Sequence, residues 1–291
     1  MRYNTSWNAL LKPGESQTWL EAAHRIRAFE HGSSYDPALA WLLSEVSRLA
    51  YKDLTHDTPM LARLKNLGLS LKAQVDKESL SAQLWTYASS NQPTFSILAF
   101  RGTLELQNWI TNLHTLTSAW NGEDSLVHRG FKTAFDSLWP RVKSHMDTCP
   151  HPRYYTGHSL GAALATLAAA THPPQALYTY GSPRVGNGAF ARHVESATPA
   201  FRLVNHRDIV TTLPWENQLS PFQHTGELHY IDHQGQRQVN PSSLNVFWAK
   251  LKQSITWKDA FNARQFVTPV KTLSDHSPIN YTYALEQDLQ N

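Results

Sequence analysis

Cysteine is almost missing from this sequence of 291 residues, in which Cys149 stands alone. A single cysteine excludes an intrachain disulfide and is typical of proteins from a reducing compartment. Residues 1–20 also lack the continuous apolar run and the small-residue cleavage site of a secretory signal. We therefore expect a cytoplasmic protein, with export by a signal-independent route as the alternative.

Long apolar runs and strong charge are lacking too. The longest apolar run, near residues 160–170, is interrupted by Thr166 and is too short to span a bilayer. The net charge is only +3 without a dense lysine or arginine run, so no nucleic-acid partner is expected. Neither the ligand spacing of a metal site nor a glycine-rich phosphate loop occurs, so we expect no metal and no cofactor.

What is present is an alternation of strand and helix patterns. Residues 36–53 have apolar residues at helical spacing, with Asp36 as N-cap, and residues 128–146 form a second helical pattern that Pro140 should break or kink. Strands are expected at residues 80–89 and 94–102, at the start of "ALYTYGSPRVGN" (residues 176–187) and in "AFRLVNHRD" (residues 200–208). A hairpin is expected at residues 226–239. This alternation favours a mainly parallel sheet covered by helices.

The segment "GHSLG", residues 157–161, has the G-x-S-x-G spacing of a nucleophile elbow. Small residues on both sides allow the chain to turn sharply from strand to helix and to present the Ser159 hydroxyl at the carboxyl end of a sheet. The alternative is that Ser159 is only a helix N-cap. The strand pattern "RYYT" before it and the helix-forming "LGAALATLAAATH" after it favour a catalytic serine.

Further motifs in the same order make this chain similar to the class 3 lipases of the α/β-hydrolase fold. They are "AFRGTLELQNWITNL", "HRGFKTAF", "GHSLGAALA", "YGSPRVGN" and "VNHRDIVTTLP". The resemblance implies an α/β protein with a mostly parallel central sheet flanked by helices and a short amphipathic lid helix. We expect one domain over residues 1–291, in which residues 1–35 form a helical extension, with a helix near residues 16–30, that packs on the core.

In α/β-hydrolases the acid and the base follow the serine in the chain. Asp208 ends a predicted strand and matches the acid of the family, although a turn-forming aspartate is the alternative. His276, on a polar loop near the C-terminus, stands where the family carries its base. The sequence departs from the family at Ile279, where an aromatic residue is usual, and Tyr281 follows two positions later.

The same resemblance implies an oxyanion hole and a lid. The hole would use the backbone amide of Leu160 and the loop residue Thr103, which otherwise acts as a simple cap. Four apolar residues after Thr103 fall on one helical face, which the resemblance makes a lid and which could otherwise be an ordinary surface helix. These lid residues are Leu106, Trp109, Ile110 and Leu113.

The resulting prediction is a monomeric serine carboxylester hydrolase that contacts a lipid–water interface transiently. A triacylglycerol lipase is favoured, and a short-chain or feruloyl-type esterase, a phospholipase or a galactolipase would use the same triad. The alternative outside enzymes is a lipid-binding protein on a hydrolase scaffold that has lost its activity. No transmembrane segment is expected.

Overall fold

The structure is a computed structural model, and it describes residues 2–26, 29, 32–89, 92–106, 116–122, 124–214, 221–242 and 271–290. Its main sheet has eight strands in the order β1-β2-β3-β6-β7-β9-β11-β12. They are β1 (Leu69–Lys77), β2 (Leu80–Ser89), β3 (Gln92–Phe100), β6 (Arg153–His158), β7 (Ala176–Tyr180), β9 (Ala200–Asn205), β11 (Glu227–Ile231) and β12 (Arg237–Val239). The five strands from β3 to β11 run parallel, and the strands at both edges are antiparallel.

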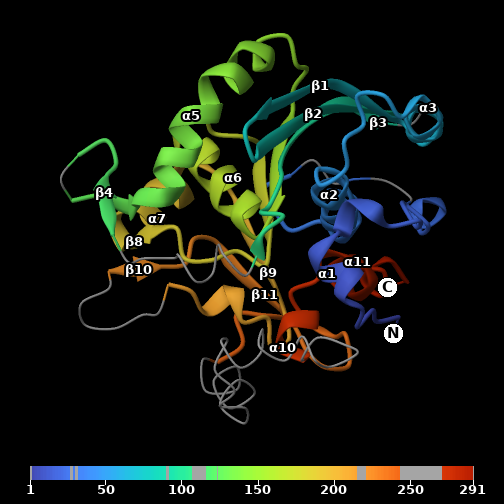
Figure 1. Cartoon of the computed structure of the whole chain (residues 1–291). Helices are drawn as coiled ribbons and strands as arrows, with labels where there is room; N and C mark the ends of the chain where they lie inside the picture. Colours follow the sequence, from blue (N-terminus) through green and yellow to red (C-terminus); the bar gives the residue numbers. More distant parts are fainter. Residues whose placement is uncertain are drawn as a thin grey trace.

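Helices cover both faces of this sheet, with α2 and α11 on one side and α5, α6 and α7 on the other (Figure 1). The α-helices of the described chain are α1 (Trp7–Leu11), α2 (Pro37–Leu49), α3 (Thr58–Asn66), α5 (Arg129–Met146), α6 (Leu160–Thr171), α7 (Gly188–Ala197), α10 (Lys271–Ser274) and α11 (Pro278–Leu285). Shorter 3₁₀ turns are η1 (Pro13–Glu15), η2 (Ala23–Arg25), η3 (Val210–Thr212) and η5 (Asp288–Gln290). The predicted α/β architecture, a mostly parallel sheet flanked by helices, is confirmed.

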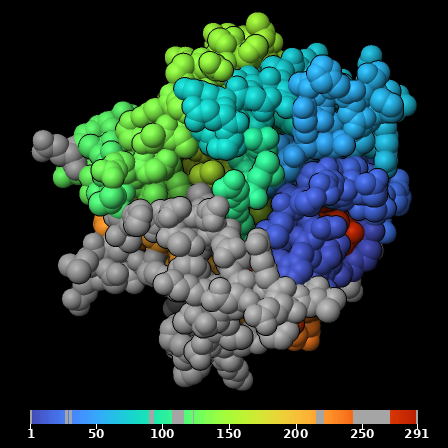
Figure 2. Space-filling view, viewed as in Figure 1, coloured from blue at the N-terminus to red at the C-terminus, as the bar shows by residue number. Residues whose placement is uncertain are grey.

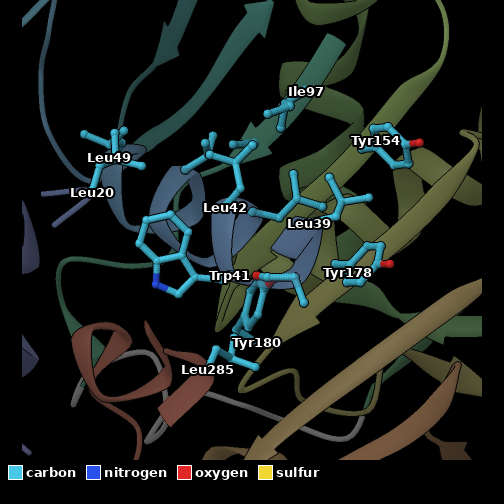
Figure 3. Close-up of a cluster of buried hydrophobic side chains, with 14 of the residues drawn as sticks. Leu20, Leu39, Trp41, Leu42, Leu49, Ile97, Tyr154, Tyr178, Tyr180 and Leu285 are labelled. Atoms are coloured by element: carbon cyan, nitrogen blue, oxygen red, sulfur yellow. The ribbon is translucent and has the colours of Figure 1, made fainter. Parts of the chain in front are cut away.

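The alternation of side chains along β3 explains why the sheet needs both helical layers. Ile97 and Ala99 are buried in the core beneath α2, whereas Leu98 and Phe100 are buried in the core beneath α6. A parallel strand with both faces buried carries a nearly continuous apolar run, as residues 97–100 of β3 do. Figure 3 shows the α2 side of this core, where Trp41 and Leu42 of α2 lie among sheet residues.

A second, smaller antiparallel sheet lies beside the helical layer of α5 and α7 (Figure 1). Its strands, in the order β10-β8-β5-β4, are β10 (Phe222–Gln223), β8 (Gly186–Asn187), β5 (Leu126–His128) and β4 (Thr117–Ala119). β5 leads directly into α5, where the side chain of His128 accepts a hydrogen bond from the amide of Phe131 as the N-cap.

Two local expectations differ from the structure. Pro140 does not interrupt α5, because it lies on the exposed side of the helix, where water can bond the carbonyl that the missing N–H leaves free. No continuous helix spans residues 16–30 among those described, because Leu20 has a left-handed backbone (φ 54°) and donates its amide to the buried carboxylate of Glu45. Trp19 and Phe29 nonetheless pack into the core beneath α2.

Candidate active site

Ser159 lies at the sharp turn between β6 and α6. Its backbone is strained (φ 60°, ψ −125°), a conformation that L-residues rarely adopt outside functional turns. It occupies the N-cap position of α6, yet its side chain makes no capping bond, and its buried Oγ has no hydrogen-bond partner in the described structure. A simple capping role therefore does not explain this serine.

The glycines on each side make the turn possible. A Cβ at Gly157 would lie 2.3 Å from the carbonyl of Gly161, and a Cβ at Gly161 would lie 2.1 Å from the backbone oxygen of Phe100. Real Cβ atoms essentially never come this close to backbone atoms. The spacing G-x-S-x-G is thus a steric requirement of packing the start of α6 against β6 and the end of β3.

Asp208 and His276 lie together on the loops that follow β9 and α10. His276 Nδ1 donates to Asp208 Oδ2 at 2.8 Å, because an ionised carboxylate can only accept, and both side chains are almost completely buried. The Asp208 Oδ1 atom accepts from the amide of Val210 at 2.9 Å. The remaining ring nitrogen, His276 Nε2, is buried and has no partner among the described residues.

The ionised state of Asp208 is stabilised within the fold. Burial alone would raise the pKa of this carboxyl, but the charge and hydrogen bond of His276 and the hydroxyl of Tyr281 outweigh it and hold the pKa below its usual value. A hydrogen-bonded carboxylate that stays ionised can fix the tautomer of the imidazole beside it.

Two residues of this site were missed by sequence reasoning. Tyr281 donates its hydroxyl to Asp208 Oδ2 at 2.6 Å and accepts from the amide of Asn205 at 3.1 Å. His158 donates from Nε2 to the carbonyl of His276 at 2.8 Å, and its Nδ1 accepts from Tyr51 at 2.9 Å. Two signals in the sequence were available: Tyr281, an aromatic residue two positions after the place where the family usually has one, and the histidine next to Ser159.

His158 also shows that the serine and the histidine are neighbours. Its ring lies 4.5 Å from the ring of His276, centroid to centroid, and its backbone continues directly into Ser159. Burial, reinforced by the nearby His276, lowers the pKa of His158 well below its usual value, so this ring is neutral at pH 7. The two unpartnered atoms, Ser159 Oγ and His276 Nε2, thus belong to one small region at the carboxyl ends of β6, β7 and β9.

Thr103 and Leu160, the predicted oxyanion residues, flank the same turn. Leu160 is the first residue of α6, so its amide has no carbonyl acceptor within the helix. Thr103 follows β3, whose last carbonyl lies against Gly161, and its hydroxyl accepts from the amide of Glu105 at 3.1 Å. The Thr103 hydroxyl thus acts as an acceptor within its own segment, and a hydroxyl that accepts can still donate one hydrogen bond.

Of the four predicted lid residues, only Leu106 falls within the described structure; Trp109, Ile110 and Leu113 lie outside it. Leu106 is buried in a small apolar cluster of its own, separate from the two main cores. The other buried members of this Leu106 cluster are Leu10, Val210, Leu213 and Leu273. The cluster thus joins the segment after Thr103 to the loop after Asp208 and to α10, just before His276.

Two kinds of feature are absent from the described residues. The described chain contains no group of three or more histidine, cysteine, aspartate or glutamate side chains arranged to hold a metal ion. None of its helices has the length and apolar character needed to cross a membrane.

The arrangement is that of an α/β-hydrolase, and comparisons with known proteins agree. A family model described as "Lipase (class 3)" matches residues 97–218. A secreted mono- and diacylglycerol lipase of Fusarium solani is 34% identical over 156 residues, covering 50% of this chain and 46% of the relative. A lipase of Rhizomucor miehei is 32% identical over 195 residues, covering 62% of this chain and 50% of the relative.

The solved structures agree on the fold. The crystal structure of a lipase from Rhizopus microsporus var. chinensis superposes with a TM-score of 0.58 at 24% identity, covering 90% of this chain and 94% of that one. Over residues 97–218 the chain is similar to the class 3 lipases. It spans about half the length of the curated relatives that it matches, between 46% and 52% for the first three.

The expected cytoplasmic location is contradicted by these relatives. The Fusarium protein and a second relative, from Penicillium cyclopium, are both named secreted mono- and diacylglycerol lipases. The inference from Cys149 was wrong, because a single cysteine excludes an internal disulfide but does not require a reducing compartment.

Proposed function

We propose that this protein is a serine carboxylester hydrolase that cleaves lipid acyl esters, with Ser159 as nucleophile, His276 as base and Asp208 as acid. One observation carries the proposal: the strained Ser159 and the Asp208–His276 pair lie in one buried region, and each presents a polar atom without a partner. Unsatisfied buried polar atoms are costly, so natural proteins retain them where function requires them.

The chemistry follows from the positions of these atoms. Ser159 Oγ attacks the ester carbonyl while His276 Nε2 takes the hydroxyl proton, and Asp208 stabilises the imidazolium that forms. The amides of Leu160 and Thr103 would hold the oxyanion, each donor contributing about 2.7–4 kcal/mol to the transition state. The alcohol leaves with the proton from His276, and water then releases the fatty acid from Ser159 by the same steps.

For the substrate we propose glycerol esters of fatty acids, because relatives that match are named lipases and mono- and diacylglycerol lipases. A segment that begins at the buried Leu106 and continues beyond the described residues would act as the lid. Exposing its four apolar side chains to water would cost at most about 6–12 kcal/mol, at about 1.5–3 kcal/mol each, and a lipid surface would remove most of that cost. A rate that rises smoothly through the solubility limit of the substrate would contradict interfacial activation.

The test is hydrolysis of p-nitrophenyl esters from acetate to palmitate by the wild type, Ser159→Ala and Ser47→Ala. Ser47 is the matched control, a buried serine of α2 whose hydroxyl donates to the carbonyl of Ser44. We expect Ser159→Ala to lose at least about 10³-fold in kcat, as removal of a triad member does, and Ser47→Ala to stay close to wild type. Near-normal turnover by Ser159→Ala would refute the assignment.

The chain-length profile and a labelling experiment distinguish the alternatives. A maximum at medium or long acyl chains supports a lipase, whereas a sharp maximum at acetate or butyrate indicates a soluble-ester esterase with the same triad. Covalent labelling of Ser159 by a fluorophosphonate distinguishes either enzyme from a lipid-binding scaffold without activity, because only an activated serine reacts.

A further inference from the structure

Residues 2–4, close to the N-terminus, lie along the turn that carries His276 and along α11. Figure 1 shows this end of the chain next to α11 and α10. The Arg2 guanidinium donates to both carboxylate oxygens of Glu286, at 2.5 and 2.6 Å. The amide and the carbonyl of Asn4 pair with the side chain of Asn280, at 2.7 and 2.8 Å. We call residues 2–4 the N-terminal strap.

Tyr3, in the middle of the strap, donates its hydroxyl to the carboxylate of Asp275, the residue directly before His276. Asp275 is 1% exposed, and its Oδ2 atom already accepts from the amide of Arg207 and from His206 Nδ1, at 3.1 and 3.3 Å. The Tyr3 hydroxyl is the only donor that the described structure gives to Oδ1. Because a buried carboxylate oxygen without a donor is costly, Tyr3 fixes the orientation of the Asp275 carboxylate.

The strap also borders a hollow beside α11. A cavity of about 800 Å³ lies here, and its lining includes Asn4, Ile279 and Tyr283. Figure 2 shows its mouth, where C-terminal residues are visible inside an opening formed by N-terminal ones. The turn before α11 is buried and is also bonded by Asn205 and Arg207, and the strap adds the hydrogen bonds on the side of the cavity.

Asn280 carries the restraint from the strap into the turn. Its Nδ2 donates to the carbonyl of Ser274 at 2.8 Å as well as to the carbonyl of Asn4. The partners lie 276 residues apart in sequence, so this contact depends on the folded chain and on no local preference. The two ends of the turn, Ser274 and Asn280, are thus held to one another and to the strap.

We infer that the N-terminal strap positions the catalytic base and that Tyr3 is its main positioning residue, acting through Asp275 on His276. The inference rests on the proposed role of His276. The His276 imidazole is fixed at Nδ1 by Asp208, and the backbone carbonyl of His276 is fixed by His158. The remaining freedom of His276 is therefore movement of the turn itself. Misplacement of a reacting group by about 1 Å can cost about 100-fold in rate.

The test is Tyr3→Phe, which removes one oxygen and keeps the ring. The matched control is Tyr283→Phe on α11, because the Tyr283 ring lies under Arg2 and its hydroxyl makes no hydrogen bond in the described structure. Both variants are assayed on p-nitrophenyl esters, with active sites counted by fluorophosphonate titration. We expect Tyr3→Phe to lose about 10- to 100-fold in kcat per titrated site, with KM changed less than about twofold, and Tyr283→Phe to match the wild type.

A second readout does not depend on turnover. The ¹H–¹⁵N imidazole signals of His276, assigned by their loss in His276→Gln, should shift in Tyr3→Phe and stay in place in Tyr283→Phe. A Tyr3→Phe protein with wild-type kcat per site and unshifted His276 signals would overturn the inference. If the wild type itself neither labels nor hydrolyses esters, the proposed function fails, and the NMR signals still decide whether the strap positions His276.

Discussion

Replacing Leu106 by alanine should raise activity on a dissolved ester, if the segment that begins there is a lid. Leu106 is only 4% exposed and packs in the Leu106 cluster against Val210, Leu213 and Leu273. Truncation of a buried leucine to alanine costs about 2–5 kcal/mol. Because Leu106 packs in a small cluster outside the two main cores, the lower value is the appropriate one. About 2 kcal/mol shifts a closed–open equilibrium roughly 30-fold toward the open state.

The assay compares a dissolved ester with an emulsified one. p-Nitrophenyl butyrate below its solubility limit reports the open fraction in water, and tributyrin as an emulsion reports the enzyme at an interface. Leu106→Ala should hydrolyse the dissolved ester up to about 30-fold faster than the wild type and the emulsion at nearly the same rate. Leu104→Ala is the matched control, since Leu104 lies two residues earlier in the same segment and is 50% exposed.

Two results would refute this reasoning. Equal rates on the dissolved ester for Leu106→Ala, Leu104→Ala and the wild type would mean that burial of Leu106 does not limit access. A lower melting temperature of Leu106→Ala with no change in rate per titrated site would mean that Leu106 belongs to the permanent core.

Two further outcomes are expected. Gly161→Ala should destabilise the fold by about 3 kcal/mol or more, because its Cβ would lie 2.1 Å from the backbone oxygen of Phe100. Gly32→Ala, with its nearest atom at 3.8 Å, should change little, and equal urea midpoints for the two variants would contradict the steric argument. Because the folded pKa of Asp208 lies below its unfolded value of about 4, the ionised carboxylate stabilises the fold above that pH, and this contribution is lost as the pH falls through the folded pKa. In urea unfolding, the free energy of unfolding of Asp208→Asn should therefore be lower than that of the wild type at pH 7, with a smaller difference near pH 3. A difference that does not change with pH would refute this.

The parts of the fold that depend on local pattern were predictable. The apolar run of β3 and the alanine-rich α6 required a strand and a helix packed closely together, and the glycines around Ser159 required a tight turn between them. Asp36 caps α2 as expected, accepting from the amide of Leu39 at 3.0 Å. These features depend on residues within a few positions of each other, so periodicity and capping rules describe them.

The contacts that close the site over long separations were not predictable in this way. The bonds of Tyr281 to Asp208 and of Tyr3 to Asp275 join residues 73 and 272 positions apart. The N-terminal segment shows the same limit, because a buried Glu45 captures the amide of Leu20 and prevents the expected helix. A sequence pattern cannot show which distant polar group will satisfy a buried donor.

The site therefore has two kinds of restraint that act on different parts of the reaction. If the segment after Thr103 is a lid, its opening would weaken the apolar contacts of Leu106 with Val210 and Leu273. The hydrogen bonds on Asp208 and Asp275 do not involve Leu106, so such an opening would leave the proposed acid and base in place. It follows that Leu106→Ala should change the ratio of dissolved to emulsified activity, whereas Tyr3→Phe should lower both activities by the same factor.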